Sequence, residues 1–409
     1  MGGLLLLLLA ACGGSGSTVG GSGDGGSAGN AGNGGSGSTA GTGGQTSPTD
    51  GSVDGAPSDS SKWVMGYYAG YQASLYPVDQ IPWASLTHVA AAFYLPRNDG
   101  TLDETLEIDA TSGPALARSL VQAAHANGRH AIASIGGAGL HDQFAAAAST
   151  DMRATFVANL VALLAKYGYD GLDLDWEPVE TADRAPLQAL VSALRAAAPA
   201  GTILTMPVGY ENVNLPDDLS IYATMSADLD QINIMTYGMA GAYEGWKSWH
   251  SSALHQTDSA TPTSVDSSVK LYLQAGVPAA KLGVGAGFYG LCYTPPVTGP
   301  DQALGASTLA GDDGSVSYAN IAAEYDLGTS QRDTAAGVLY LSFTTGTGPQ
   351  ACGYLSYEDA QSLGDKGAYV QTNHLGGAII WTINEGYLPS AAAGQRSPLL
   401  TALGAAVLK

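Results

Sequence analysis

Four acidic residues lie within eight positions of this chain, in the segment Asp170-Gly-Leu-Asp-Leu-Asp-Trp-Glu177. If this segment is a β-strand, its side chains alternate between two faces, so Asp173, Asp175 and Glu177 point the same way. Carboxyl groups held this close resist ionising together, which separates their pKa values as acid–base catalysis requires. We therefore take the row as a candidate catalytic centre. An acidic edge in solvent and a cation site are the alternatives.

Eight short apolar runs follow Lys62 and alternate with amphipathic, alanine-rich segments. We expect strands at 63–67, 87–94, 130–135, 168–176, 203–207, 231–237, 281–286 and 376–382. Helical periodicity is clearest at 113–127, 153–167 and 185–197. Eight such repeats predict a (β/α)8 TIM barrel, whose active site lies at the C-terminal ends of the strands. Glu177 follows the fourth strand directly, where this fold places its chemistry.

The N-terminus carries a short apolar run of six leucines followed by Ala10-Ala11-Cys12. This run is too short to span a bilayer and is typical of a secretion signal. The last four residues resemble the lipobox of bacterial lipoproteins, although no Lys or Arg precedes the leucines. We expect residues 1–12 to be a signal peptide with a lipobox and Cys12 to carry a lipid anchor. An ordinary cleaved signal peptide is the alternative, and both send the protein out of the cytoplasm.

Residues 13–61 consist almost entirely of Gly, Ser, Thr, Ala and Asn. Such a segment has too little apolar surface to offset the entropy of ordering it. We therefore expect a linker here, with the catalytic barrel at residues 62–409.

The seventh and eighth strands are too far apart for one connecting helix. Residues 290–372 contain a strand pattern at 337–343 and a helix pattern at 317–325, which predicts an inserted α+β subdomain. Cys292 and Cys352 both lie inside it. In an exported protein they form a candidate disulfide, worth about 4 kcal/mol in the chain-entropy model. Two unpaired buried thiols are the alternative.

The charge balance bears on possible partners. The net charge is −21 with only 15 Lys and Arg, which argues against nucleic-acid binding but does not repel a neutral polymer. The seven histidines show no metal-ligand spacing, so we expect no metal and no other cofactor. We expect a monomer that touches a membrane only through the anchor at Cys12.

The acidic segment matches the DxxDxDxE signature of glycoside hydrolase family 18, the chitinases and their relatives. Three further segments resemble family motifs in the same order: Ser134-Ile-Gly136-Gly137, Asn233-Ile-Met235-Thr-Tyr237 and Gly376-Gly-Ala-Ile-Ile-Trp381. The insertion resembles the subdomain of bacterial-type chitinases. The resemblance covers the chain from Trp63 to the C-terminus.

This resemblance implies substrate-assisted catalysis, in which the sugar's own 2-acetamido oxygen attacks the anomeric carbon. Glu177 is then the general acid and base. Asp175 binds the acetamido N–H and shares a proton with Asp173, and Tyr237 hydrogen-bonds the acetamido oxygen.

Further residues are implied as substrate contacts, with plain core or strand packing as the alternative for each. Trp381 offers a face on which a sugar ring stacks. The other expected contacts are Tyr67, Phe93, Gly136, Gly137 and Met235. Asp170 and Ser134 are expected to support the motif structurally.

Two departures from the family pattern affect sugar binding. Gly238 stands where an Asp usually follows the tyrosine of the strand-6 motif, and Leu291 and Tyr293 stand where an Arg and a Trp are often found. We therefore expect affinity or cleavage pattern to differ from that of close relatives.

The resemblance implies a chitinase that hydrolyses β-1,4-linked N-acetylglucosamine in chitin or chitooligosaccharides with retention. One alternative is an endo-β-N-acetylglucosaminidase acting on glycans or cell wall. The other is a non-catalytic chitin-binding lectin, although such proteins usually lose the acid that Glu177 provides.

Overall fold

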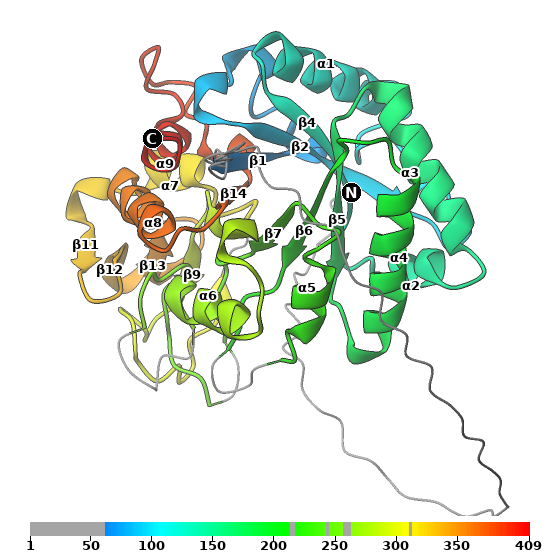
Figure 1. The fold of residues 1–409 in the computed structure, drawn as a ribbon. Helices are drawn as coiled ribbons and strands as arrows, with labels where there is room; N and C mark the ends of the chain where they lie inside the picture. The colour runs from blue at the N-terminus through cyan, green and yellow to red at the C-terminus, as the bar shows by residue number, and fades with distance from the viewer. Residues whose placement is uncertain (1–61, 213–216, 243–244, 257–262, 311–312) are drawn as a thin grey trace, which may run out of the picture. The chain divides into compact units, whose positions relative to one another are not determined.

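The computed structural model describes residues 62–212, 217–242, 245–256, 263–310 and 313–409 (Figure 1). The predicted signal peptide, the lipid anchor at Cys12 and the linker at 13–61 lie outside the described residues. Among the described residues, every helix is too short or too polar to cross a membrane.

Within the described part of the chain, eight parallel strands close into a barrel in the order β1-β14-β8-β7-β6-β5-β4-β2, and β2 pairs back to β1. They are β1 (Trp63–Ala69), β2 (His88–Pro96), β4 (His130–Ala138), β5 (Gly171–Glu177), β6 (Ile203–Val208), β7 (Gln231–Ile234), β8 (Leu282–Gly287) and β14 (Gly377–Trp381). A short strand, β3 (Leu102–Asp103), pairs antiparallel with the end of β2. The predicted (β/α)8 barrel is confirmed.

Helices cover the outside of the barrel (Figure 1). They are α1 (Ser112–Ala126), α2 (His141–Ala148), α3 (Arg153–Tyr167), α4 (Arg184–Ala197), α5 (Ser220–Met225), α6 (Val265–Gln274), α8 (Ala360–Thr372) and α9 (Pro398–Val407). Short 3-10 helices occur at Gly70–Gln72, Val78–Gln80, Trp83–Ser85, Thr181–Asp183, Ala279–Lys281, Leu327–Thr329 and Ile383–Gly386. The three predicted helices match α1, α3 and α4 to within one residue.

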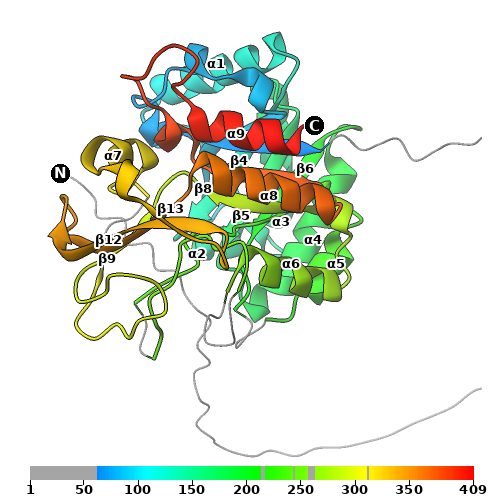
Figure 2. The same ribbon diagram turned by 90° about the vertical axis from the view of Figure 1, so that its left-hand side faces the viewer.

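The segment of the chain that connects β8 to β14 forms a second sheet, at the left of Figure 2. Its strands pair antiparallel in the order β10-β9-β13-β12-β11. They are β9 (Leu291–Tyr293), β10 (Leu309–Ala310), β11 (Gln331–Asp333), β12 (Val338–Thr347) and β13 (Cys352–Tyr357), accompanied by α7 (Tyr318–Glu324). Helix α8, which we placed inside the insertion, packs against β8, β14 and α9, as a barrel helix does (Figure 2).

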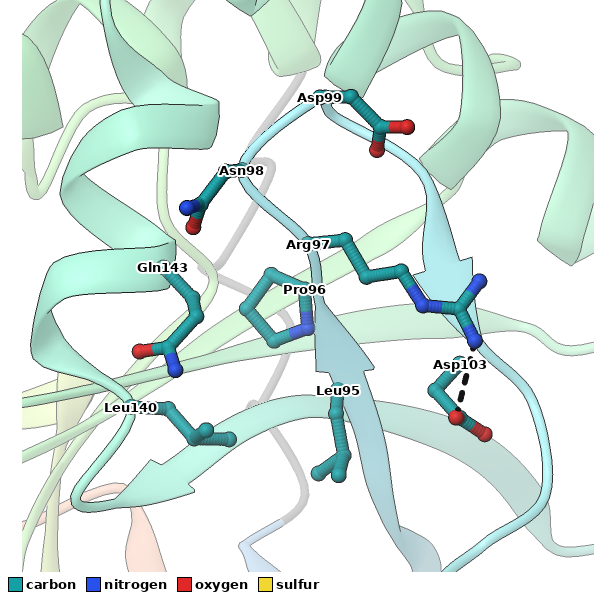
Figure 3. Close-up of a pocket in the computed structure, with 8 residues that line it drawn as sticks. All are labelled: Leu95, Pro96, Arg97, Asn98, Asp99, Asp103, Leu140 and Gln143. Atoms are coloured by element: carbon teal, nitrogen blue, oxygen red, sulfur yellow. Dashed lines mark hydrogen bonds and ion pairs between the residues drawn. The ribbon is translucent and has the colours of Figure 1, made fainter.

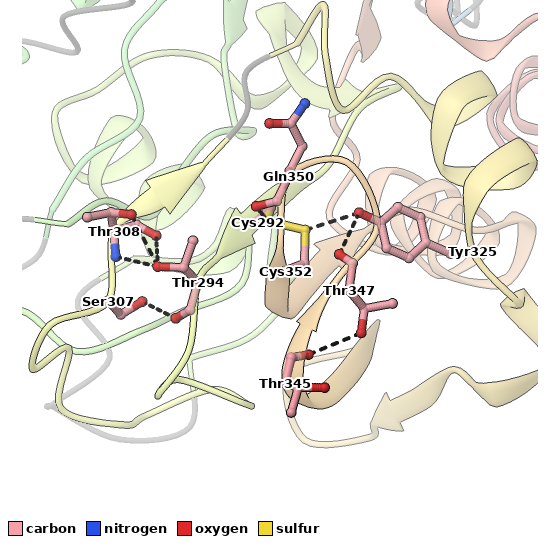
Figure 4. Close-up of a disulfide and its surroundings, with 9 residues drawn as sticks. All are labelled: Cys292, Thr294, Ser307, Thr308, Tyr325, Thr345, Thr347, Gln350 and Cys352. Carbon is pink, nitrogen blue, oxygen red and sulfur yellow. Dashed lines mark hydrogen bonds between the residues drawn. A yellow bond between two sulfur atoms is a disulfide. The ribbon is translucent and has the colours of Figure 1, made fainter.

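The insertion is cross-linked at its centre. Cys292 on β9 and Cys352 on β13 form a disulfide with a Cα–Cα distance of 5.3 Å, and both residues are fully buried (Figure 4). The two strands are neighbours in the sheet. The bond therefore ties together two strands that are 60 residues apart in the chain.

The barrel strands are buried along both faces, as expected for a parallel sheet covered by helices. All seven residues of β1 are buried. Its side chains alternate, so that Tyr68 faces the helix-covered core while Met65 and Tyr67 join a cluster inside the barrel. The same alternation along β5 carries the acidic row inward.

Candidate active site

Strand β5 directs the three acids into the barrel. Leu172, Leu174 and Trp176 pack in the helix-covered core, and the acids alternate with them. Asp173 and Asp175 are buried, whereas Glu177 at the mouth is partly exposed. The alternation expected from the sequence is therefore present, and the row runs from the barrel interior to its C-terminal end.

Asp173 is held by three hydroxyl groups. Tyr67 and Ser134 donate to its Oδ2 at 2.9 and 2.8 Å, and Thr205 donates to its Oδ1 at 2.5 Å. Burial raises the pKa of Asp173 above its usual range, and the three hydrogen bonds oppose this rise. Ser134 and Thr205 stand beside Asp173 in register on β4 and β6. Asp173 is thus fixed in orientation from three strands.

Asp175 is paired with Glu177, the next acid of the row toward the barrel mouth. It is hydrogen-bonded to Glu177, and its Oδ1 is buried with no hydrogen-bond partner among the described residues. Burial, then the charges of Glu177 and Asp173, raise its pKa well above the usual range. A buried oxygen without a donor costs about 1–3 kcal/mol, so a donor on a ligand would be stabilised there. The predicted proton sharing with Asp173 stays a prediction.

Glu177 has a pKa above its usual range. Burial raises its pKa, and the hydrogen bond from Asp175 works against this rise. Because the two carboxyl groups contact each other, their site favours holding one proton between them. A carboxyl group with a raised pKa is better suited to donating a proton to a leaving group than one with the usual pKa.

Tyr237 approaches the acids from a loop. Strand β7 ends at Ile234, three residues before the predicted end, because the Thr236 hydroxyl bonds the backbone N–H and C=O of Gly285 instead of extending the strand. A Cβ atom at Gly285 would lie 2.7 Å from the Tyr237 ring, so glycine admits the ring there. Burial, with nearby Tyr289 and Glu177, raises the pKa of Tyr237, which keeps its hydroxyl a donor.

Aromatic rings surround Trp381 at the end of β14. The Phe93 ring stacks at 5.4 Å between centroids, and the Tyr67 ring lies at 5.6 Å. Met235 packs against the same cluster. Trp381 is partly exposed, whereas Tyr67 is 1% exposed and spends its hydroxyl on Asp173. Trp381 is therefore the most exposed of these three rings, and the predicted substrate contacts of Tyr67, Phe93, Met235 and Trp381 stay predictions.

The two glycines of the β4 motif allow close packing beside the acids. Gly136 and Gly137 have φ values of 108° and 98°, which side chains rarely adopt. A Cβ atom at Gly136 would lie 2.2 Å from the Asp175 carbonyl oxygen, and one at Gly137 would lie 2.9 Å from the Phe93 ring. Their predicted contact with substrate stays a prediction.

Asp170 lies at the start of β5, before the row of acids. Its Oδ2 accepts from the backbone N–H of Ala131 at 2.7 Å and contacts His125 Nε2 at 2.9 Å. The side chain therefore ties β5 to β4 and α1, which fits a supporting role.

One group of side chains has the geometry to hold a metal ion. Among the described residues, His141, Glu180 and Asp183 bring ligand atoms within 4.8 Å of one another. Asp183 Oδ2 already accepts from the Glu180 backbone N–H and contacts His141 Nε2, both at 2.8 Å. Helix capping and an ion pair thus account for the cluster, and the expectation of no metal stays a prediction.

Comparison with known proteins identifies the family. The sequence model of "Glycosyl hydrolases family 18" matches residues 63–386. The chain belongs to this family. Endochitinase 1 of Metarhizium robertsii is 27% identical over 363 residues, 76% of this chain and 78% of that protein. Chitinase A1 of Niallia circulans is 30% identical over 287 residues, 62% of this chain and 40% of that protein.

Solved structures share the fold. The Ostrinia furnacalis group IV chitinase in complex with allosamidin has a TM-score of 0.71 at 23% identity, covering 84% of this chain and 98% of that one. Human YKL-39, described as a pseudo-chitinase that retains chitooligosaccharide binding, has a TM-score of 0.72 at 18% identity, covering 85% and 99%. The same fold therefore occurs in a chitinase and in a pseudo-chitinase. The fold alone does not show whether a protein is catalytic, so the residues of the site must be considered.

Sequence reasoning missed three residues of this family 18 site. Thr205 donates to Asp173, and its strand register would have revealed it. Burial raises the pKa of Tyr289, and the nearby charges of Asp313 and Glu177 raise it further. Asp313 Oδ2 accepts from the Trp381 indole at 2.8 Å, although it lies 68 residues away in the insertion. No sequence signal pointed to that contact.

The departures from the family 18 pattern are accommodated by local packing. Gly238 has a φ of 62°, and its backbone N–H donates to the Ser251 hydroxyl at 3.4 Å. Leu291 and Tyr293 are buried on β9, and the Tyr293 hydroxyl donates to the Gly241 carbonyl oxygen. In this protein Gly238 therefore belongs to the loop after β7, and Leu291 and Tyr293 belong to the buried part of the insertion.

Proposed function

We propose that this protein is a chitinase that hydrolyses β-1,4-linked N-acetylglucosamine with retention of configuration. The observation that carries the proposal is the pairing of Asp175 and Glu177. One carboxyl group presents a buried oxygen with no donor, and its neighbour at the barrel mouth has a raised pKa. A second nucleophilic carboxylate is not required if the substrate provides its own nucleophile.

In the proposed reaction, Glu177 donates its proton to the glycosidic oxygen as the bond to the anomeric carbon breaks. The substrate's acetamido oxygen attacks that carbon from the opposite side and forms a cyclic intermediate. Asp175 Oδ1 accepts a hydrogen bond from the acetamido N–H, and the Tyr237 hydroxyl donates to the acetamido oxygen. Water then opens the cyclic intermediate, and Glu177 takes up the proton that the water loses. This restores the resting site.

Asp173 acts through Asp175 rather than on the sugar. Its three hydroxyl donors favour its ionised form. Its charge contributes to the raised pKa of Asp175, so the Asp175–Glu177 pair keeps the proton that the first step consumes.

Replacing Glu177 by Gln tests the proposal. The substitution keeps the size of the side chain and removes the proton donor, so kcat on chitohexaose should fall by about 10²–10⁴-fold. Glu324→Gln, at an exposed position on α7, is the matched control and should keep the wild-type rate. Full activity of the Glu177→Gln variant would contradict the proposed role.

The same assay separates the alternatives. An endo-β-N-acetylglucosaminidase would use the same acids but prefer a high-mannose glycopeptide to chitohexaose. A non-catalytic lectin would bind chitohexaose without releasing products, and Glu177→Gln would not change that binding. Product analysis of the wild-type protein on both substrates therefore decides the substrate class.

We also propose that the protein is exported and anchored through Cys12. The lipobox-like N-terminus supports this, and the Cys292–Cys352 bond fits an oxidising compartment. Expression of the full chain in a bacterium, with membrane fractionation, tests it. Wild-type protein should sediment with membranes and Cys12→Ala should not. Equal release of both would contradict anchoring.

A further inference from the structure

A buried ion pair joins the end of β13 to α8. Glu358 follows β13 directly, Lys366 lies in α8, and their charged groups contact each other, with side chains that are only 2% and 1% exposed. The Ser362 hydroxyl donates to the second carboxylate oxygen of Glu358. The proposed reaction uses none of these three residues.

Burial sets this pair apart from the ion pairs at the surface. Arg97 and Asp103, beside the end of β2, form a surface pair at 3.0 Å with side chains that are 55% and 30% exposed (Figure 3). Removing two charges from water is unfavourable, and apolar side chains of similar size often stabilise such a position equally well. Stability alone therefore does not account for Lys366 and Glu358.

Lys366 connects the pair to a serine in the segment between β7 and α6. Its Nζ donates to the Ser252 hydroxyl oxygen at 2.5 Å. An ammonium group only donates, so the Ser252 oxygen accepts from it, and the hydroxyl proton is directed to another acceptor. That acceptor is the backbone carbonyl oxygen of Thr236. A continuous chain of hydrogen bonds thus runs from Glu358 to Thr236.

Thr236 directly precedes Tyr237, and the two residues share the peptide unit that this chain of hydrogen bonds reaches. Because a peptide unit is planar, the direction of the Thr236 carbonyl group also fixes the direction of the Tyr237 backbone N–H. That N–H donates to the Met235 carbonyl oxygen at 2.8 Å. The peptide lies beyond the last residue of β7, so the bond from Ser252 helps to set its orientation.

The neighbouring residue Ser251 holds the same loop at a second point. The Met239 backbone N–H donates to the Ser251 carbonyl oxygen at 2.8 Å, and the Ser251 N–H donates to the Ser356 hydroxyl on β13 at 3.1 Å. All three residues are buried. Residues 251–252 therefore link the loop that carries Tyr237 to β13 and α8.

We propose that Lys366, Glu358 and Ser252 are positioning residues for the Tyr237 hydroxyl. Gly285 and Gly287 leave room for the side chain, since a Cβ atom at these positions would lie 2.7 and 3.0 Å from Tyr237 atoms. The chain of hydrogen bonds fixes the peptide that carries this side chain. The inference rests on the proposed chitinase function, in which the Tyr237 hydroxyl donates to the acetamido oxygen, and extends the site to residues that act through Tyr237.

Ser252→Ala tests the proposal by steady-state kinetics on chitohexaose. It removes the donor to the Thr236 carbonyl group and leaves both charges in place, so kcat should fall by about tenfold through misplacement of Tyr237. In a Tyr237→Phe background the same substitution should leave kcat unchanged, because the hydroxyl that Ser252 positions is already absent. The matched control is Ser248→Ala. Ser248 is buried, and its hydroxyl donates to the Gly299 carbonyl oxygen at 2.7 Å, so this variant should keep the wild-type kcat.

A second variant tests the ion pair itself. Lys366→Met alone leaves Glu358 buried without its cation and should be strongly destabilised. Lys366→Met/Glu358→Gln removes both charges, so it should fold, as circular dichroism would show. Its kcat should still fall, because the Ser252 hydroxyl loses the donor that directs it. Arg97→Met, which breaks the surface pair, should keep the wild-type kcat. A folded double variant with the wild-type kcat would overturn the role of the pair.

The outcomes distinguish the positioning role from the proposed function. A wild-type kcat in Ser252→Ala would overturn the positioning role and leave the function standing. An equal fall of kcat in the wild-type and Tyr237→Phe backgrounds would assign Ser252 to general packing, which also overturns it. If the wild-type protein released no product from chitohexaose, the chitinase function and the positioning role would fall together.

Discussion

Replacing Tyr67 by Phe removes one of the three hydroxyl groups that donate to Asp173, at 2.9 Å, and leaves the aromatic ring beside Trp381 in place. Hydrogen bonds to the ionised form of Asp173 lower its pKa, so removing one makes Asp173 easier to protonate. In the proposed mechanism Asp173 acts through its negative charge on Asp175, so activity requires Asp173 to be ionised. Activity should therefore be lost at a higher pH than in the wild type.

The size of this effect follows from the lost bond. A hydrogen bond to a charged group contributes about 1.5–3 kcal/mol, and 1.36 kcal/mol corresponds to one pH unit. Because Ser134 and Thr205 still donate to Asp173, we expect an effect at the lower end of this energy range. The acid limb, the acidic side of the pH–activity profile, should move by about one unit toward higher pH. The assay is kcat/KM on chitooligosaccharides measured across the acid range.

Tyr68→Phe is the matched control for this prediction. Tyr68 is also buried on β1 but points outward, and its hydroxyl donates to the carbonyl oxygens of Ala73 and Tyr76. It should lose stability of about 1 kcal/mol without displacing the acid limb. An acid limb of Tyr67→Phe that coincides with that of Tyr68→Phe would refute the reasoning.

Two further predictions concern stability. Burial raises the pKa of Glu211 from 4.5 to about 7, so its contribution to stability is complete below about pH 4.5 and is lost as the pH rises through 7. We would measure the free energy of urea unfolding at pH 5 and at pH 8. Between these two pH values the Glu211→Gln variant should lose less stability than the wild type, by at most about 3 kcal/mol. Equal losses in the two proteins would be evidence against this. Replacing Cys292 and Cys352 together by Ala should lower the free energy of unfolding by about 4 kcal/mol and abolish the effect of a reductant. A double variant as stable as the oxidised wild type would contradict a structural role for the bond.

The barrel and the acidic row could be predicted because they depend on local periodicity. Eight apolar runs with intervening helices specify the fold, and alternation along β5 places three acids on one face. The ends of the strands could be predicted less accurately, because the caps of neighbouring helices also determine where a strand begins. The strand β5 begins at Gly171 rather than at Gly168, because Gly168 ends α3 with a φ of 81°.

Contacts made across the fold could not be predicted in the same way. The bond from Trp381 to Asp313 depends on how the insertion folds back over the barrel. The role of Tyr67 depends on its hydroxyl reaching Asp173 across 106 positions of sequence.

Substrate assistance is the central claim, and the products of partly deacetylated chitin test it most directly. Only a sugar that carries an acetyl group at the reacting position supplies the nucleophile, so every new reducing end released by the wild-type protein should be N-acetylated. Sequencing the oligosaccharide products by mass spectrometry measures this. Efficient release of products with a free amine at the reducing end would contradict the account.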